Sequence, residues 1–218
     1  GEKGEVPVIW KDIPDTTTEG LKTITGEVEG SKLKAIVTYN VLPIELKVEK
    51  IAADNLKEIT IQFSDEVDVE KATDINNYNI KVGTLKKDIS KVILSEDKKE
   101  VKLVLNTEIG QQQKAEITIK KEIGLDNDVV MPISIFDVNP PNLINVEAIG
   151  NRRIKVVFSE PVKNITTLTN YYLDGKILTK GIVKQNADAI VITLEDRLSE
   201  GIHNFTVSDF VSDYAGNR

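Results

Sequence analysis

The chain has 218 residues, and its 35 acidic side chains outnumber its 28 lysines and arginines, which leaves a formal charge of -7. Because lysines and acids are interspersed, the chain lacks the basic face that nucleic-acid phosphates select, which argues against nucleic acid as a partner. There is no cysteine, so no disulfide, thiol nucleophile or cysteine zinc site is available. No run approaches the roughly 20 apolar residues of a membrane helix, so we expect no membrane insertion.

The first segment, residues 1–43, has the pattern of a small antiparallel sheet. Val8 and Trp10 occupy alternate positions, and a second run starts at Leu21. A third run, residues 33–41, alternates apolar and polar side chains, as a strand with one buried face does. About 44 residues bury too little apolar surface to fold well alone. We therefore expect a partial domain that either lacks its first strands or leans on the next domain.

Residues 44–138 have the pattern of a β-sandwich. Short apolar runs at regular spacing, separated by polar turns such as residues 95–98, are typical of this architecture. Val69–Thr73 is expected to form one helical turn between strands. The candidate strands of three or more residues are Ile59–Phe63, Val92–Leu94, Val101–Leu105, Ala115–Ile119 and Met131–Ile135.

A stiff linker and an internal repeat follow. Residues 137–142 contain Pro140 and Pro141, which fix φ and cannot donate ladder hydrogen bonds, so this stretch is the predicted boundary before residues 139–218. Beyond it, four landmarks of the second segment return in the same order, which indicates that one β unit was used twice. Ile154–Val162 corresponds to Ile59–Val67, Asn170–Leu173 to Asn77–Ile80, Ile190–Leu194 to Val101–Leu105, and Phe205 with Val207 to Ile117 with Ile119.

Two stretches carry a family resemblance. Residues 8–10, 19–30 and 35–38, with their Trp, two glycines and closing strand, resemble the second half of a bacterial Ig-like domain of the group 4 type. The run Phe158-Ser159-Glu160-Pro161-Val162, the Asn-Tyr pair at 170–171 and residues 211–217 resemble the Ig-like repeats of bacterial surface-layer proteins. The second segment departs from this pattern, since Glu66 replaces the proline and the Ala-Gly-Asn ending is missing.

The resemblance implies an all-β chain of tandem Ig-like β-sandwiches joined by short linkers, with domains at 1–43 (partial), 44–138 and 139–218. It further implies a structural, non-catalytic segment of a secreted surface-layer or cell-wall protein that acts as spacer and assembly module at the bacterial cell surface. The expected partners are other copies of itself, neighbouring surface proteins or cell-wall polysaccharide. Two alternatives remain: an adhesive or carbohydrate-binding module, and accessory domains of a large extracellular hydrolase.

No catalytic residue is predicted. His203 is the only histidine, and the sequence contains no Gly-x-Ser-x-Gly motif whose serine could form a catalytic triad with it. We therefore expect His203 to lie at the surface in a strand. Asp65 and Glu160 end equivalent strands in different domains, too far apart for a glycosidase pair, and are interpreted as turn-forming acids. Tyr78 and Tyr171 occupy matching repeat positions, as buried tyrosines with tethered hydroxyls would.

Ligand binding has two weak candidates. Tyr172 is replaced by Asn79 in the other copy and so is free to contact a ligand such as a sugar. Calcium is the candidate metal, because Asp137, Asn139 and Asn142 crowd a domain junction with oxygen donors. A second, looser cluster consists of Asp209, Asp213 and Asn217. Turns use Asp and Asn for their own backbone hydrogen bonds more often than for metals, so linkers without a metal or other cofactor remain the default expectation.

Overall fold

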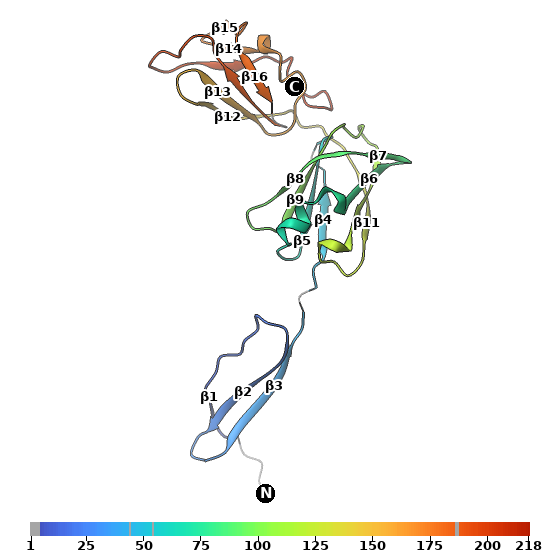
Figure 1. Cartoon of the computed structure of the whole chain (residues 1–218), viewed down its shortest axis with the longest axis vertical. Coiled ribbons are helices and arrows are strands. Elements are labelled where there is room, and N and C mark those ends of the chain that lie inside the picture. Colours follow the sequence, from blue (N-terminus) through green and yellow to red (C-terminus); the bar gives the residue numbers. More distant parts are fainter. Residues whose placement is uncertain (1–4, 44, 54, 186–187) are drawn as a thin grey trace. The chain divides into compact units, whose positions relative to one another are not determined.

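The computed structural model describes residues 5–43, 45–53, 55–185 and 188–218, and the chain divides after residue 45 into two compact units. Within these residues every pairing between named strands is antiparallel, which confirms the all-β prediction (Figure 1). No helix in the described part is long and apolar enough to cross a bilayer. The predicted start of the second domain, residue 44, lies outside the described residues.

The first unit is a single antiparallel sheet of β1 (Val8–Trp10), β2 (Gly20–Val28) and β3 (Lys34–Val41) in that order. Cross-strand pairs such as Ile24 with Val37 place apolar side chains on one face, as the alternation predicts. Yet Val37 is 40% exposed and Trp10 is 43% exposed. The sheet therefore has no second layer within its own described residues.

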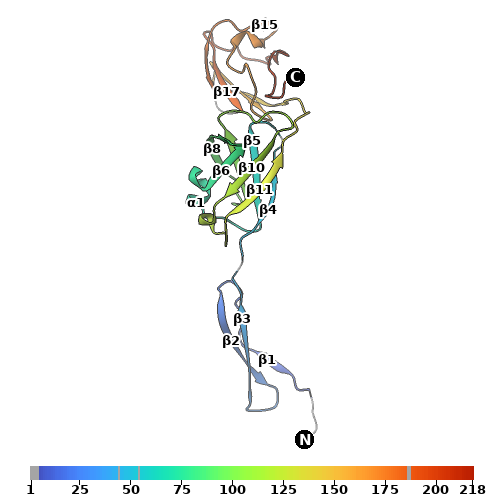
Figure 2. The same ribbon diagram turned by 90° about the vertical axis from the view of Figure 1, so that its right-hand side faces the viewer.

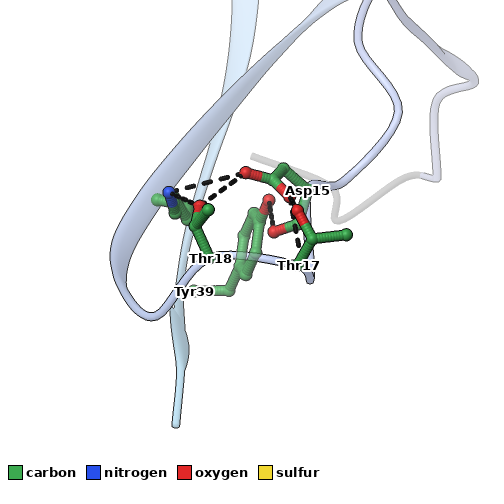
Figure 3. A network of polar contacts seen from close by, with 5 residues as sticks. Asp15, Thr17, Thr18 and Tyr39 are labelled. Carbon is green, nitrogen blue, oxygen red and sulfur yellow. Dashed lines mark hydrogen bonds and ion pairs between the residues drawn. The ribbon is translucent and has the colours of Figure 1, made fainter. Parts of the chain in front are cut away.

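The loop between β1 and β2 is held by a polar network around Asp15 (Figure 3). Its carboxylate accepts hydrogen bonds from the Thr17 hydroxyl and backbone N–H and from the Thr18 hydroxyl, at 2.6 to 2.9 Å. These donors hold the pKa of Asp15 well below its usual range. The Tyr39 hydroxyl donates to the backbone carbonyl of Asp15 at 3.1 Å, which ties this loop to β3.

The second unit begins with two sheets that enclose one core; we call this part the middle sandwich. One sheet has the order β4 (Val48–Ala52), β5 (Glu58–Phe63), β9 (Glu100–Leu105) and β8 (Ile89–Leu94), and the other β11 (Val129–Ser134), β10 (Lys114–Ile119), β6 (Tyr78–Val82) and β7 (Leu85–Lys87). Alternate residues turn inward, so that Ile59 and Ile61 from one sheet and Ile117 and Ile119 from the other are fully buried.

Short helical turns lie between strands of the middle sandwich. The helix α1 (Val69–Thr73) follows β5 at the position that the sequence predicts, and the Asp68 carboxylate caps it by accepting from the Lys71 N–H at 3.0 Å. The 3₁₀ turns η1 (Ile75–Asn77) and η2 (Lys121–Ile123) precede β6 and β11 (Figure 2).

The remaining strands form a second two-sheet domain, which we call the C-terminal sandwich. Its sheets have the orders β12 (Leu143–Ala148), β13 (Arg153–Phe158), β17 (Ala189–Thr193), β16 (Ile182–Gln185) and β15 (Lys176–Ile177), β14 (Tyr171–Leu173), β18 (Phe205–Val207), with η3 (Leu168–Asn170) before β14. Its core is separate from that of the middle sandwich and contains Val156, Tyr171, Ile190 and Ile192.

The two sandwiches share one strand order. In the first sheet, β12-β13-β17-β16 matches β4-β5-β9-β8, and in the second, β15-β14-β18 matches β7-β6-β10. The landmark strands of the repeat therefore occupy equivalent places in the two sandwiches: β13 corresponds to β5, and β17 corresponds to β9. The domain boundaries at residues 43 and 138 and the Ig-like topology stay predictions.

Candidate metal centre

The site begins where the middle sandwich ends, at Asp137. The side chain of Gln111 fixes the backbone there: its Oε1 accepts from the Asp137 N–H at 2.9 Å, and its Nε2 donates to the Asp137 carbonyl. Asp137 is only 1% exposed, although it begins the proline linker. Its Oδ1 accepts a 3.3 Å hydrogen bond from the Asn139 N–H. A linker acid is therefore held inside the protein.

The second acid, Asp213, belongs to the last loop of the C-terminal sandwich and is fully buried. Its Oδ1 accepts from the backbone N–H groups of Gly216 at 2.5 Å and Asn217 at 2.7 Å, and its Oδ2 accepts from Asn217 Nδ2 at 2.7 Å. The same Nδ2 lies 3.4 Å from the carbonyl oxygens of Asp137 and Asn139. Asn217 therefore joins this last loop, residues 208–218, which we call the closing loop, to the linker.

Glu160, two residues beyond the end of β13, is the third acid. It is 8% exposed, and carboxylate oxygens of Asp137, Glu160 and Asp213 lie within 4.8 Å of one another. Two buried oxygens of this group, Asp137 Oδ2 and Glu160 Oε2, have no hydrogen-bond partner among the described residues. Three carboxylates from three separate segments thus converge in one buried place.

It is energetically unfavourable for all three carboxylates of this cluster to be ionised at once. Burial raises the pKa of Glu160 to about 8, with further contributions from the charges of Asp137, Asp213 and Glu58. Burial also raises the pKa of Asp137, and the charge of Asp213 adds to this, while the hydrogen bond from the Asn139 N–H acts in the opposite direction. A proton or a cation must compensate the negative charge, since unpaired buried charges are costly.

Comparison with known proteins shows which proteins the chain is similar to. No protein-family profile matches it. It is 32% identical over 212 residues to the surface-layer 125 kDa protein of Lysinibacillus sphaericus, over 93% of this chain and 17% of that protein. It is 34% identical over 118 residues to the outer cell wall protein of Brevibacillus brevis, over 54% of this chain and 11% of that protein. The chain is a homologue of surface-layer and outer cell wall proteins.

This surface-layer homologue spans less than a fifth of the length of the curated relatives it matches. The homology indicates a location at the cell surface. Among solved structures, the chain is similar to the N-terminal part of the bacterial S-layer protein SbsC, with 13% identity and a TM-score of 0.41 over 70% of this chain and 45% of that one. It is also similar to SbsC domains 1-6, with 12% identity and a TM-score of 0.42 over 80% of this chain and 33% of that one.

In the structure of the surface-layer homologue, the acids of the two predicted calcium clusters are grouped differently from the prediction. Asp137 from the first and Asp213 from the second come together, whereas Asn139 and Asn142 are exposed, and the Asn142 amide donates to the Pro140 carbonyl at 3.4 Å. Asp209 is also exposed. Two acids of the cluster therefore come from different predicted sets, and the third, Glu160, belongs to neither.

Of the two strand-end acids, only one is a turn residue. Asp65 is half-buried, its carboxylate accepts a hydrogen bond from the Glu66 N–H at 2.8 Å, and it lies 3.3 Å from Lys99 Nζ. The interpretation of Glu160 as a turn-forming acid is wrong, because its side chain is buried against two other carboxylates. The sequence offered one signal for this difference, since Pro161 replaces the solvated Glu66 of the other copy.

The remaining predicted residues lie away from the cluster. His203 precedes β18 rather than lying in a strand, and its Nδ1 is 2.8 Å from Asp174 Oδ2. Tyr172 is half-buried in β14, opposite Thr206. A hollow of about 320 Å³ beside β14 and β15 is lined by residues such as Leu173 and Arg197 rather than by Tyr172.

Proposed function

We propose that this chain is a non-catalytic spacer and assembly segment of a cell-surface protein layer, with consecutive sandwiches held at a fixed angle. The observation that carries the proposal is the position of Tyr214. This residue belongs to the closing loop of the C-terminal sandwich but packs against the core of the middle sandwich. A side chain that crosses the junction in this way restricts rotation between the two domains.

Two lysines, one from each sandwich, reinforce this contact. Lys57 Nζ lies 4.7 Å and Lys163 Nζ lies 5.3 Å from the centroid of the Tyr214 ring. At these distances the ammonium groups form cation–π interactions with the face of the ring. Lys163 Nζ also donates to the Tyr214 carbonyl at 3.0 Å. Together with the bonds of Asn217 to the linker, these contacts support a stiff joint.

The burial of the carboxylate cluster supports a non-catalytic role. Asp137 is 1% and Asp213 0% exposed, so a substrate cannot reach them as it would reach a pair of catalytic acids in a cleft. The partners that the proposal assigns are copies of the same protein or neighbouring surface proteins. Saturable binding of cell-wall polysaccharide that Tyr172→Ala abolishes would favour the carbohydrate-binding alternative instead.

The stiffness of the joint can be tested with spin labels, because the chain has no native cysteine. Lys86→Cys and Lys176→Cys place one label on an exposed strand of each sandwich. Pulsed electron resonance should give one narrow distance distribution, which Tyr214→Ala broadens because the crossing side chain is lost. Phe210→Ala is the matched control, since Phe210 lies in the same loop but is 67% exposed. A broad distribution in the parent chain would overturn the proposal.

A further inference from the structure

The middle sandwich has a hollow whose charged lining is mostly lysine. This basic hollow, of about 590 Å³, lies beside β6 and β7, and Lys86, Lys87 and Lys120 line it together with one acid, Asp88. The Lys87 ammonium donates to the backbone carbonyl of Glu108 at 2.7 Å, which fixes its position without neutralising its charge. Within the described residues none of the three lysines forms an ion pair. The hollow therefore presents uncompensated positive charge on a chain whose net charge is -7.

The fold does not require this positive charge, because the C-terminal sandwich has the same strand order without it. Lys120 directly follows Ile119, and at the equivalent place after Val207 the C-terminal sandwich has Ser208. The strand β7 contains two of the lysines of the basic hollow, whereas the equivalent β15 contains one lysine, Lys176. Charge that one copy of the repeat has and the other lacks indicates an interaction specific to the middle sandwich.

A second hollow, with the opposite charge, adjoins the first. This acidic hollow, of about 540 Å³, is lined by Glu70, Asp74 and Glu122 together with one lysine, Lys71. The turn η1 borders both hollows, because residue 77 lines the acidic hollow and residues 75 and 76 line the basic one. Glu122 is also only two residues from Lys120 of the basic hollow. In the described part of the chain these three acids form no ion pair, so both hollows keep their charge.

Hydrogen bonds fix the two hollows relative to each other. Asn77, the last residue of η1, donates from Nδ2 to the Lys71 carbonyl at 2.8 Å, and its own carbonyl accepts from the Lys120 N–H at 2.9 Å. The Tyr78 hydroxyl donates to the Ala72 carbonyl at 2.7 Å. The helix α1, the turn η1 and the segment after β10 are thus bonded to one another. Charges held in a fixed arrangement lose little conformational freedom on binding, which favours their use in recognition.

We propose that the two hollows form a self-complementary surface through which the middle sandwiches of two copies of this chain associate about a twofold axis. In a twofold interface the same patch serves both partners, so the lysines of each copy face the acids of the other. Such an axis close to η1 exchanges the two hollows, because η1 borders both. The inference rests on the proposed assembly role, names a second copy as the partner and assigns the contact to this surface.

Charge complementarity sets the register of this contact more than its strength. Two copies with a net charge of -7 repel each other in most orientations, and pairing of the basic with the acidic hollow removes this repulsion in one of them. Ion pairs between exposed side chains are individually weak and are screened by salt. We therefore expect a weak, salt-sensitive dimer of the isolated chain. In a layer, where each copy makes further contacts, the same weak pairing gains effective concentration.

Sedimentation equilibrium of the whole chain over a series of concentrations tests the association. We expect a reversible monomer–dimer equilibrium whose dissociation constant rises at least about tenfold between about 20 mM and about 500 mM NaCl. A chain that is monomeric at every concentration, or that forms open-ended polymers, would overturn the proposal. Association that persists in high salt would also overturn it, but would leave the assembly role intact, because the contact would then be apolar.

Charge reversal locates the contact. Lys86→Glu and Glu122→Lys each change an exposed side chain and should weaken self-association at least about tenfold, because like charges then face each other. An equimolar mixture of the two variants should associate again, since each reversed residue meets the opposite charge on its partner. This rescue also excludes a folding defect as the cause of the loss.

The matched controls make the same changes of charge elsewhere on the same sheet. Lys114→Glu and Glu116→Lys alter exposed residues of β10 that line neither hollow, and both should leave the dissociation constant within about twofold of the parent value. An equal loss of association in the controls would assign the effect to net charge and overturn the proposal. Failure of the mixed variants to associate would do the same.

Discussion

The hydroxyl of Tyr171 donates a 2.6 Å hydrogen bond to the backbone carbonyl of Ile165, six residues earlier in the chain. Tyr78 forms the equivalent bond of 2.7 Å to Ala72 in the middle sandwich. Both rings are buried, and burial raises the pKa of both hydroxyls. Each tyrosine therefore pins the segment before its strand to the core, as the matching repeat positions predict.

The tether should have a measurable effect on stability. Tyr171→Phe keeps the ring but leaves the Ile165 carbonyl without its donor, so we expect the free energy of unfolding to fall by about 1 to 2 kcal/mol, and likewise for Tyr78→Phe. Urea unfolding followed by circular dichroism measures the change. Tyr172→Phe is the control, since its hydroxyl forms no hydrogen bond within the described residues and its removal should change little. A loss of equal size in the control would refute the assignment.

Much of the fold could be predicted because its signals are local. Strict alternation predicted β5 and β13, and the structure has the helix α1 at the position of the predicted helical turn, Val69–Thr73. Strands with weak alternation were missed. β12 has exposed Leu143 and Ile144, and β7 and β15 are short and rich in lysine. Pairing with a neighbouring strand, rather than their own pattern, defines these elements.

The site was harder to predict because it depends on contacts between distant segments. Asp137 was found as a junction acid, and Asp213 as part of a loose cluster, but nothing in the periodicity brings them together. Glu160 looked like any acid at the end of a strand. Its burial follows from the way the closing loop with Asn217 folds back onto the linker, which is a tertiary contact.

The two units should respond differently to the loss of an apolar side chain. Ile117 is fully buried in the middle sandwich, so Ile117→Ala should cost about 2 to 5 kcal/mol of unfolding free energy through lost burial and a cavity. Ile36 has the same side chain on β3 but is 66% exposed, and Ile36→Ala should stay within about 0.5 kcal/mol. Chemical unfolding of the whole chain measures both. A large effect of Ile36→Ala would show that another layer covers the first sheet.

The pair of His203 and Asp174 predicts a pH-dependent contribution to stability. The pKa of His203 is raised because its ring bonds to the Ser199 carbonyl and the Asp174 carboxylate, while the bond from His203 lowers the pKa of Asp174, with Lys176 adding a minor effect. A raised histidine pKa stabilises the folded state below the unfolded value near 6.5, and this is lost as the pH rises. The lowered Asp174 pKa contributes above about 3.8.

The difference in stability between the parent and His203→Gln should therefore be larger at about pH 5.5 than at about pH 8.5. Because both side chains are solvent-accessible, the effect should be small and weakened by salt. The pH series of urea midpoints is repeated in Asp174→Asn, where the pH dependence of the histidine substitution should shrink. An unchanged dependence in that background would assign the effect to another group.

The turn before β16 should depend on a glycine for two separable reasons. Gly181 has a φ of 137°, which other residues rarely adopt, and a Cβ there would lie 2.2 Å from the backbone carbonyl oxygen of Thr193. Gly175 also has a positive φ, 75°, but a Cβ would meet nothing within 4 Å. Gly175→Ala should therefore cost about 1 kcal/mol from backbone strain alone. Gly181→Ala should cost more, because β16 must also move away from β17, and urea unfolding of the two variants should separate them. Equal losses would mean that the turn relaxes without disturbing the strand pair.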